Sequence, residues 1–394
     1  MTTLGAPQHD ELVGRATELV PLIRKHAAWQ EEHRVLHDDV LRAVVDAGLL
    51  RMRVPHRYGG YESDARTVCA VISELSRGDG SLGWTSATMA IGTWQTGLFP
   101  DEVQDEVFAD PDVRLGGSIS PGGVAVPTEG GVILNGRWPF CTGVTQSQWF
   151  VHSALLAAGD GERVPVIILV PVSELEIVDD WFTSGLRGTG SVTTVVKDLF
   201  VPEARVLPMT PVIREGRHRS LKNADSPVWK SLFSPIASAG VSAVPLGMVQ
   251  AAREVFFERL PTRKITYTDY KRQIDAPLTH LQVAEAAVKI DEAEFHVRRA
   301  TERLDGKAST GEGWTLVERG LARMDMGATC MRAKEAMDIL RTASGGSSVY
   351  SDVPIQRIDR DIQTICLHGV LHPNTNLELY GRILCGLEPN SHLI

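Results

Sequence analysis

Two histidines near the end of the chain are the side chains best suited to acid–base chemistry. His368 and His372 lie four residues apart in the segment TICLHGVLHPN. An imidazole has an unperturbed pKa near neutrality, so it can hold or release a proton under ordinary conditions. Two imidazoles at this spacing can also bind a metal ion, but no third ligand is apparent and Pro373 interrupts the helix that would carry them. A purely structural histidine pair is the other alternative.

Motifs for hydrolysis, metal binding and nucleotide binding are absent from the sequence. No HExxH, GxSxG or GxxxxGK[ST] occurs, and the run GLRGTGS, Gly185 to Ser191, lacks the glycine spacing of a dinucleotide fingerprint. The five cysteines are scattered without CxxC spacing, which is typical of reduced packing residues. Hydrolase and metalloenzyme functions are therefore disfavoured, and no metal cofactor is predicted.

The composition is that of a folded globular protein. The chain has 394 residues, 43% apolar and 23% charged, and roughly 150 residues per domain predicts two or three folding units. Its formal charge of −9, without a long run of one sign, argues against nucleic-acid binding. The first fifteen residues do not resemble a signal peptide, and no apolar run reaches the roughly 18 residues of a membrane span. We therefore expect a cytoplasmic protein with neither a nucleic-acid nor a membrane partner.

Three segments with different patterns must position the candidate residues. Residues 10–109 are predicted to be helical because apolar residues recur at three- and four-residue spacing. Residues 112–208 are rich in glycine and short β-branched runs, which predicts a small barrel or sandwich. Four helical runs follow, enough for an antiparallel bundle, at 241–257, 278–304, 318–343 and 354–384. The predicted domains are residues 1–112, 113–225 and 226–394.

Several motifs occur in the order found in the acyl-CoA dehydrogenase superfamily. They include DGSLGW from Asp79, NGRWPFCTG from Asn135, GLRGTGS from Gly185 and QRIDRD from Gln356. The resemblance covers nearly the whole chain. It implies an α+β fold with an N-terminal helical domain, a central β-barrel domain and a C-terminal four-helix bundle. It also implies a flavin between the β domain and the bundle of a homotetramer, with part of each site supplied by a neighbouring subunit.

The resemblance assigns cofactor contacts to particular residues. Thr142 aligns with the family threonine that bonds near the flavin N5, and the glycine-rich run carrying Ser118 and Ser120 can bring small hydroxyls to the flavin edge. Arg263 lies where the family places an arginine on the flavin phosphate. The remaining predicted cofactor contacts are Trp138, Cys141, Gly345 and Gly346. Strand hydrogen bonding for Thr142, a surface ion pair for Arg263 and helix capping for the glycines are the structural alternatives.

A missing side chain separates this sequence from the dehydrogenases. Those enzymes need a carboxylate to remove the α-proton of a thioester, and the family carries it after the RD pair or on the first bundle helix. Neither residues 362–377 nor residues 226–253 contain an Asp or a Glu. Instead, His368 stands eight residues after Arg360 of the RD pair. This pattern resembles the two-component flavin-dependent monooxygenase branch of the superfamily.

The branch implies a specific chemistry. Reduced FMN or FAD diffuses from a separate NAD(P)H:flavin reductase and reacts with O2, and the resulting C4a-hydroperoxyflavin hydroxylates an aromatic or polyketide-like substrate. His368 is the first candidate for stabilising the peroxide or activating a substrate hydroxyl, and His372 the second. Thr142 completes the predicted catalytic set.

One departure concerns the substrate pocket. Several aromatic hydroxylases of the branch have a second histidine near the position of Gly92, whereas this sequence has none between His56 and His152. The predicted pocket residues are Trp84, Met89 and Trp94, with core packing as their alternative. A dehydrogenase or oxidase with another base, an N-oxygenase of an amine or amino sugar, and a non-catalytic ligand-binding relative remain open alternatives.

Overall fold

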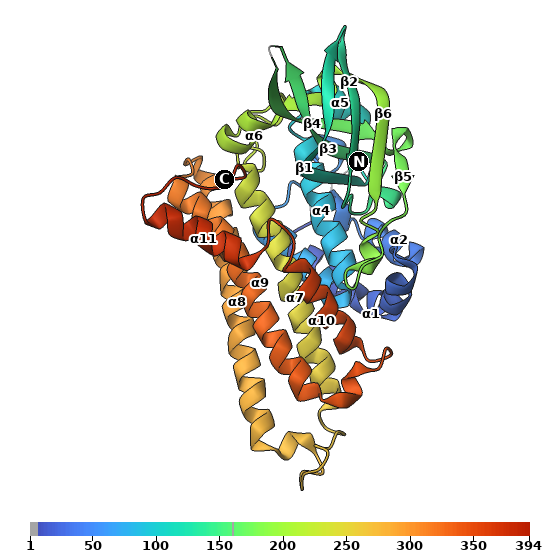
Figure 1. Ribbon diagram of the computed structural model, residues 1–394, viewed down its shortest axis with the longest axis vertical. Coiled ribbons are helices and arrows are strands. Elements are labelled where there is room, and N and C mark those ends of the chain that lie inside the picture. Colours follow the sequence, from blue (N-terminus) through green and yellow to red (C-terminus); the bar gives the residue numbers. More distant parts are fainter. Residues whose placement is uncertain (1–6, 160) are drawn as a thin grey trace.

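The first part of the chain is helical, as the sequence predicts. A computed structural model describes residues 7–159 and 161–394. Figure 1 shows the sheet at one end of the molecule and the long C-terminal helices extending away from it. The Asp79 carboxylate accepts the Ser81 N–H at 3.2 Å at the start of the fourth helix, which satisfies a free amide there. The helices are α1 (His9–His33), α2 (Asp38–Asp46), α3 (Ala65–Gly78), α4 (Gly80–Thr96) and α5 (Asp101–Val107).

The central part is one seven-stranded sheet with the order β5-β6-β2-β1-β3-β4-β7. Neighbouring strands are antiparallel except for the parallel pair β1–β3. The sequence predicts a barrel or sandwich here. Among the described residues, no strand pairing joins β5 to β7. The two edge strands are therefore not hydrogen-bonded to each other, and the sheet does not close through backbone pairing. The strands are β1 (Leu115–Thr128), β2 (Gly131–Trp138), β3 (Trp149–Ala158), β4 (Glu162–Pro171), β5 (Glu176–Val178), β6 (Thr193–Pro202) and β7 (Val206–Pro208).

The last part contains a short helix and the bundle. Its helices are α6 (Met209–Glu215), α7 (Phe233–Arg259), α8 (Pro277–Thr310), α9 (Leu316–Ser344), α10 (Pro354–Ile365) and α11 (Pro373–Leu384). The prediction of one helix over 354–384 is wrong, because a turn separates α10 from α11. Pro373 is the first residue of α11 and His372 caps it, so the two candidate histidines do not share a helix.

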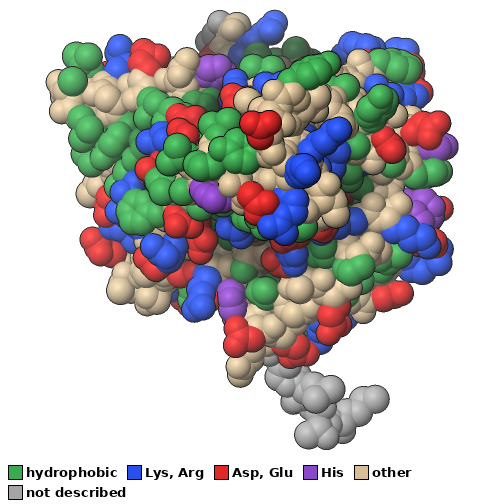
Figure 2. Space-filling model, turned by 90° about the horizontal axis from the view of Figure 1, so that it is seen from below, with side chains coloured by type: hydrophobic (Ala, Val, Ile, Leu, Met, Phe, Trp, Pro, Cys, Tyr) green, Lys and Arg blue, Asp and Glu red, His purple; other side chains and the backbone are tan. Residues whose placement is uncertain are grey.

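The long helix α7 is the centre of the bundle. It packs against α3, α4, α8, α9 and α10. Its mean hydropathy of 1.3 over 18 residues is enough for a membrane span, a run that the sequence analysis missed, but 94% of that window is buried inside the protein. Among the described residues, α7 is therefore a core helix. Figure 2 shows acidic and basic side chains mixed over the face that it displays, with hydrophobic side chains among them.

Candidate functional site

A large cavity lies where the sheet, α4, the beginning of α7 and the α10–α11 turn meet. Its volume is about 1110 Å³, above the usual range for a single small ligand. Five residues that the sequence analysis singled out line this cavity: Trp84, Ser118, Ser120, Thr142 and His368. The structure thus brings together residues that are as much as 284 positions apart in the sequence.

A chain of hydrogen bonds fixes the hydroxyl of Thr142. The Trp84 indole N–H donates to Thr142 Oγ1 at 3.2 Å, and Thr142 Oγ1 lies 2.8 Å from Ser191 Oγ. Ser191 Oγ lies 2.7 Å from Thr189 Oγ1, which donates to the Leu186 carbonyl at 2.8 Å. Each hydroxyl has one proton, and Thr189 gives its proton to the Leu186 carbonyl. Ser191 must therefore donate to Thr189 and accept from Thr142. Thr142 therefore donates to Ser191 and keeps an acceptor lone pair.

The loop that carries Ser191 is held by the RD motif. The Leu186 N–H donates to Asp361 Oδ1 at 2.6 Å, and Leu186 has a left-handed φ of 50°. A Cβ at Gly185 would meet the Arg360 carbonyl at 2.2 Å, so only glycine allows this approach. Burial, together with the nearby Asp79 carboxylate, raises the pKa of Asp361 to about 7. The motif residues therefore position the Thr142 hydroxyl chain from behind the cavity.

His368 reaches the cavity from the α10–α11 turn. Its ring lies 4.9 Å from that of Trp84 in an edge-on arrangement, and its Nδ1 accepts the Val370 N–H at 3.3 Å. This bond places the proton of the neutral ring on Nε2. Burial lowers the pKa of His368 to about 4, so the ring is neutral near pH 7. Its accessible surface opens into the cavity.

The serines of β1 lie on an irregular stretch of that strand. The pairing of β1 with β3 shifts register between Gly117 and Gly123, so the backbone around Ser118 and Ser120 leaves the regular ladder. The Ser118 carbonyl accepts the Ser153 hydroxyl at 3.1 Å. This stretch presents the small hydroxyls of Ser118 and Ser120 to the cavity, beside Ile119 and Pro121.

Eight predicted site residues do not line the cavity. Trp138 and Cys141 are buried in the core of the sheet, where the Trp138 indole donates to the Ser153 carbonyl at 2.7 Å. Trp94 is also buried and donates to the Val228 carbonyl at 2.9 Å, and Met89 is only 3% exposed. His372 is the N-cap residue of α11 but makes no side-chain capping bond, and its Nδ1 is buried without a hydrogen-bond partner among the described residues.

Three other predicted residues, Arg263, Gly345 and Gly346, gather at the opposite end of the bundle. A Cβ at Gly345 would lie 2.8 Å from the Arg263 guanidinium, and Arg263 donates weakly to the Ala343 carbonyl at 3.5 Å. Burial and the neighbouring Arg259 charge lower the pKa of Arg263. Among the residues that the structure describes, no ion pair includes Arg263. These three residues are named the far-end cluster below. The cluster presents the Arg263 cation without an acidic partner among the described residues.

The cavity also contains residues that the sequence analysis missed. Gln95, Phe140, Arg214 and Arg323 line it, as do residues 390–393. Phe140 is 67% exposed and has a left-handed φ of 61°. The chain's last residues lie far from every motif in the sequence, so only the fold shows their place. The helical period could have placed Gln95 at the cavity, because Gln95 follows Thr88 by seven residues and both lie on the same face of α4.

Gly92 accounts for the missing second histidine. A Cβ there would meet the carbonyls of Leu115 and Gly116 at 2.9 and 3.0 Å. Helix α4 therefore packs directly against the start of β1 at this position, which leaves no room for an imidazole without a shift of backbone.

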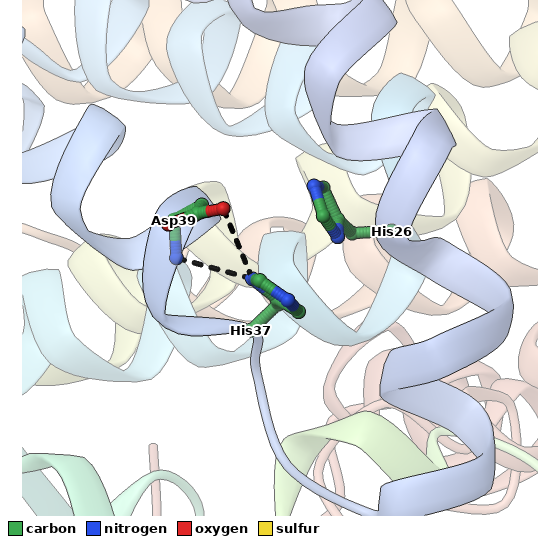
Figure 3. Close-up of side chains that lie close together, drawn as sticks. All are labelled: His26, His37 and Asp39. Carbon is green, nitrogen blue, oxygen red and sulfur yellow. Dashed lines mark hydrogen bonds and ion pairs between the residues drawn. The ribbon is translucent and has the colours of Figure 1, made fainter.

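One group of possible metal ligands was also missed, because its members come from two helices. Figure 3 shows His26 of α1 beside His37 and Asp39 at the start of α2. Their candidate ligand atoms lie within 4.8 Å of one another. The His37 Nδ1 already accepts the Asp39 N–H at 3.1 Å, and the two imidazole rings are 3.9 Å apart in a tilted stack. None of the three lines the cavity.

Comparisons with known proteins identify the family. Residues 15–109 match the acyl-CoA dehydrogenase N-terminal domain, and residues 239–373 match the acyl-CoA dehydrogenase C-terminal domain. The flavin-dependent monooxygenase oxygenase subunit HsaA from Mycobacterium tuberculosis (strain ATCC 25618 / H37Rv) is 30% identical over 397 residues and covers 100% of both chains. This chain belongs to that monooxygenase family.

Other relatives agree with this assignment. The oxygenase component of the FADH(2)-dependent resorcinol hydroxylase from Rhizobium sp. (strain MTP-10005) is 30% identical, with 97% of this chain and 95% of the relative covered. The structure of XiaF from Streptomyces sp. in complex with FADH2 and glycerol has a TM-score of 0.92 and 33% identity, and the match covers 97% of each chain. The HsaA crystal structure has a TM-score of 0.91 and 29% identity, covering 98% of this chain and 100% of HsaA.

These findings confirm the predicted acyl-CoA dehydrogenase-like fold and the predicted activity. The protein is the oxygenase component of a flavin-dependent monooxygenase. None of the described residues that line its cavity is an Asp or a Glu, so the cavity also lacks the carboxylate base of a dehydrogenase.

Proposed function

We propose that this monooxygenase hydroxylates a small aromatic or polyketide-like substrate, with the flavin ring against Thr142 and the substrate against His368. The observation that carries the proposal is the single cavity that both side chains face. Its volume of about 1110 Å³ gives room for a cofactor ring and a substrate together. Most of its remaining wall is apolar, for example Ile91, Phe233 and Val241, which suits an aromatic compound and keeps bulk water away.

The hydroxyl of Thr142 matches a reduced flavin. When bound, reduced FMN or FAD supplies the two electrons with which dioxygen is activated. Thr142 Oγ1 donates its proton to Ser191 and accepts from Trp84. What it offers the cavity is a lone pair, which suits the N5–H of a reduced flavin and not the unprotonated N5 of an oxidised one. Ser118 and Ser120 would hold another edge of the ring.

We assign to His368 the role of a hydrogen-bond donor at the reacting oxygen atoms. A histidine with a pKa of about 4 is a weak base. Its neutral ring carries a proton on Nε2, because Nδ1 accepts from Val370. The ring can therefore hold a proton near dioxygen or a substrate hydroxyl without becoming charged. His372, outside the cavity wall, is the weaker candidate.

The far-end cluster would act on flavin bound to another subunit. Arg323 and Ser344 lie on α9, 21 residues apart, which at 1.5 Å per residue is about 30 Å. Arg263 and Gly345 therefore lie too far from Thr142 to hold the same flavin ring. An arginine without an acidic partner fits a flavin phosphate, and a homotetramer would bring it to a neighbour's cavity.

The surface of α8 supports the tetramer. Large apolar residues are exposed along one face at three- and seven-residue spacing. A row of this kind favours burial against another copy of the chain. The row is formed by Leu278, Leu281, Val288 and Phe295, which are 59%, 70%, 54% and 43% exposed.

The electrons would come from a separate NAD(P)H:flavin reductase, by diffusion of the reduced flavin, in the cytoplasm. The sequence carries no nicotinamide fingerprint. The names of the relatives, oxygenase subunit and oxygenase component, agree with this division of labour.

Coupling between flavin oxidation and product formation tests the proposal. Chemically reduced FMN or FAD is mixed with the protein, oxygen and one of three probes taken from substrates named for relatives: resorcinol, p-hydroxyphenylacetate and indole-3-acetate. We expect at least one probe to give a product heavier by one oxygen atom, with less hydrogen peroxide than without the probe. Quantitative release of peroxide with all three would contradict the proposal.

A further inference from the structure

The cavity wall carries positive charge without negative charge. Arg214 and Arg323 line it, and none of its described lining residues is acidic. Arg214 comes from the end of α6, and Arg323 comes from α9. Figure 1 shows the C-terminus beside α6, at the same end of the bundle, and residues 390–393 complete this wall.

Arg323 is buried without a counter-charge. Arg323 is only 5% exposed. Its guanidinium donates to Asn376 Oδ1 at 2.9 Å and to the Leu393 carbonyl at 2.8 Å. A contact of 3.5 Å to the Val370 carbonyl is weaker. All three acceptors are neutral, and they leave N–H groups of the guanidinium unused. Burial lowers the pKa of Arg323 to about 10, and no nearby carboxylate opposes this shift.

The neighbours of Arg323 add to the positive charge. Arg319 precedes it by one helical turn, and the Arg319 Nε is buried without a hydrogen-bond partner. Burial and the charge of Arg214 both lower the pKa of Arg319. The nearest acid in the sequence, Asp325, lies on another face of α9 and pairs with Arg299 of α8. Within residues 7–159 and 161–394, no ion pair includes Arg214, Arg319 or Arg323.

A buried charge without a partner is costly, and an anion brought into the cavity would remove that cost. We infer that Arg323, with Arg214 and Arg319, forms a subsite for a carboxylate group on the aromatic substrate. The inference rests on the proposed function and narrows it, because the substrate is then an aromatic acid. The guanidinium of Arg323 binds the carboxylate, and Arg214 adds charge at the same wall. Arg319 does not line the cavity, and it adds positive charge close to Arg214.

Matched acids and amides test the subsite directly. Protein loaded with reduced FMN under anaerobic conditions is titrated with p-hydroxyphenylacetate and its amide, and with indole-3-acetate and its amide. A charge-assisted pair in a buried site makes the acid bind about tenfold or more tightly than the amide in at least one pair. Arg323→Gln abolishes this preference, and Arg214→Gln, at an exposed residue, reduces it. The control Arg217→Gln, whose arginine already pairs with Glu215, preserves it.

Two results overturn the subsite. In the first, no acid binds more tightly than its amide. In the second, Arg214→Gln and Arg323→Gln abolish the preference for reduced FMN over reduced riboflavin and leave the acid preference intact, which would assign the arginines to the cofactor phosphate. Failure of the proposed function looks different, because the acid would bind in preference to its amide and yet be released without added oxygen.

Discussion

The two ends of α9 differ in how much of a binding site a single chain supplies. Around Arg323, the sheet, α4, α6, α7 and the α10–α11 turn enclose one cavity with a fixed hydroxyl, a neutral imidazole and a positive wall. Around Ser344, the chain offers the far-end cluster, which consists of a cation and two glycines. The comparison teaches that the groups we propose for the reaction lie on one cavity of a single chain, whereas we assign the far end to another subunit's flavin. The two tasks should therefore separate by mutation.

The largest expected effect is at the cavity end. His368→Ala should lower the hydroxylated product per reduced flavin by about 100-fold or more, because a positioned proton donor contributes on this scale. Reduced flavin should still be oxidised, and the dioxygen that it reduces should be released as hydrogen peroxide. The matched control is His372→Gln in the same turn, which should keep near-normal coupling. Equal losses in both variants would show that the turn is disturbed and that His368 has no special role.

A smaller effect is expected at the far end. Arg263→Ala should weaken the binding of reduced FMN or FAD about tenfold, because it removes a charge-assisted bond to phosphate. Reduced riboflavin, which has no phosphate, should bind equally well to both proteins. Fluorescence titration under anaerobic conditions measures these affinities. A similar loss with riboflavin would contradict phosphate binding by Arg263.

Opening the subunit contact should reproduce that loss without touching Arg263. Leu281→Lys with Val288→Lys places charge in the exposed apolar row of α8 and should dissociate the tetramer that we propose, as measured by sedimentation velocity. The dissociated protein should bind flavin several-fold more weakly, and this loss should come only from the missing contact with the flavin phosphate. Glu129→Lys, at an exposed turn of the sheet, is the control and should remain tetrameric. Full flavin affinity in a monomer would rule out a contribution from a neighbour.

The hydroxyl chain gives a subtler test of the cavity end. Ser191→Ala removes the acceptor of the Thr142 proton, and one such hydrogen bond contributes about 1 kcal/mol, or roughly fivefold. Thr142 can then donate to an oxidised flavin, so the preference for reduced over oxidised flavin should fall by that factor. Ser191→Thr, which keeps a hydroxyl, should restore it. An unchanged preference would show that Thr142 does not contact N5.

A separate effect is expected on the pH dependence of stability. The pKa of His368 falls from 6.5 in the unfolded chain to about 4 in the folded one, so between these values only the unfolded chain takes up the proton. Stability is fully present above pH 6.5 and is lost as the pH falls toward 4. His368→Gln should reduce this loss in urea titrations at pH 7 and pH 5. An identical loss in the variant would indicate that the ring is solvated.

Much of the fold followed from local patterns, and the site followed only in part. The order of motifs indicated the family because each motif serves a local need, as when Asp361 holds the Leu186 amide. Thr142, Ser118, Ser120, Trp84 and His368 were expected at the site, and the structure places them on one cavity. Their roles in catalysis stay predictions.

The missed residues show why local patterns were insufficient. Arg323 and residues 390–393 reach the cavity through tertiary packing, which no spacing in the sequence reveals. Trp94 was expected in the pocket because its type suits one, but its face of α4 points into the core, where its indole bonds to Val228. The turn between α10 and α11 was hidden by apolar residues on both sides of it, which continue a helical period.

The most direct test of the central claim is a single turnover with ¹⁸O2. Flavin is reduced chemically, no reductase is present, and the probe that gives product in the coupling experiment is supplied with the protein. The account predicts one ¹⁸O atom in each product molecule and the second in water, with a yield of labelled product about 100-fold lower in His368→Ala. Product oxygen derived from the solvent, or an unchanged yield of labelled product in that variant, would contradict the claim that this cavity performs oxygen transfer with the help of His368.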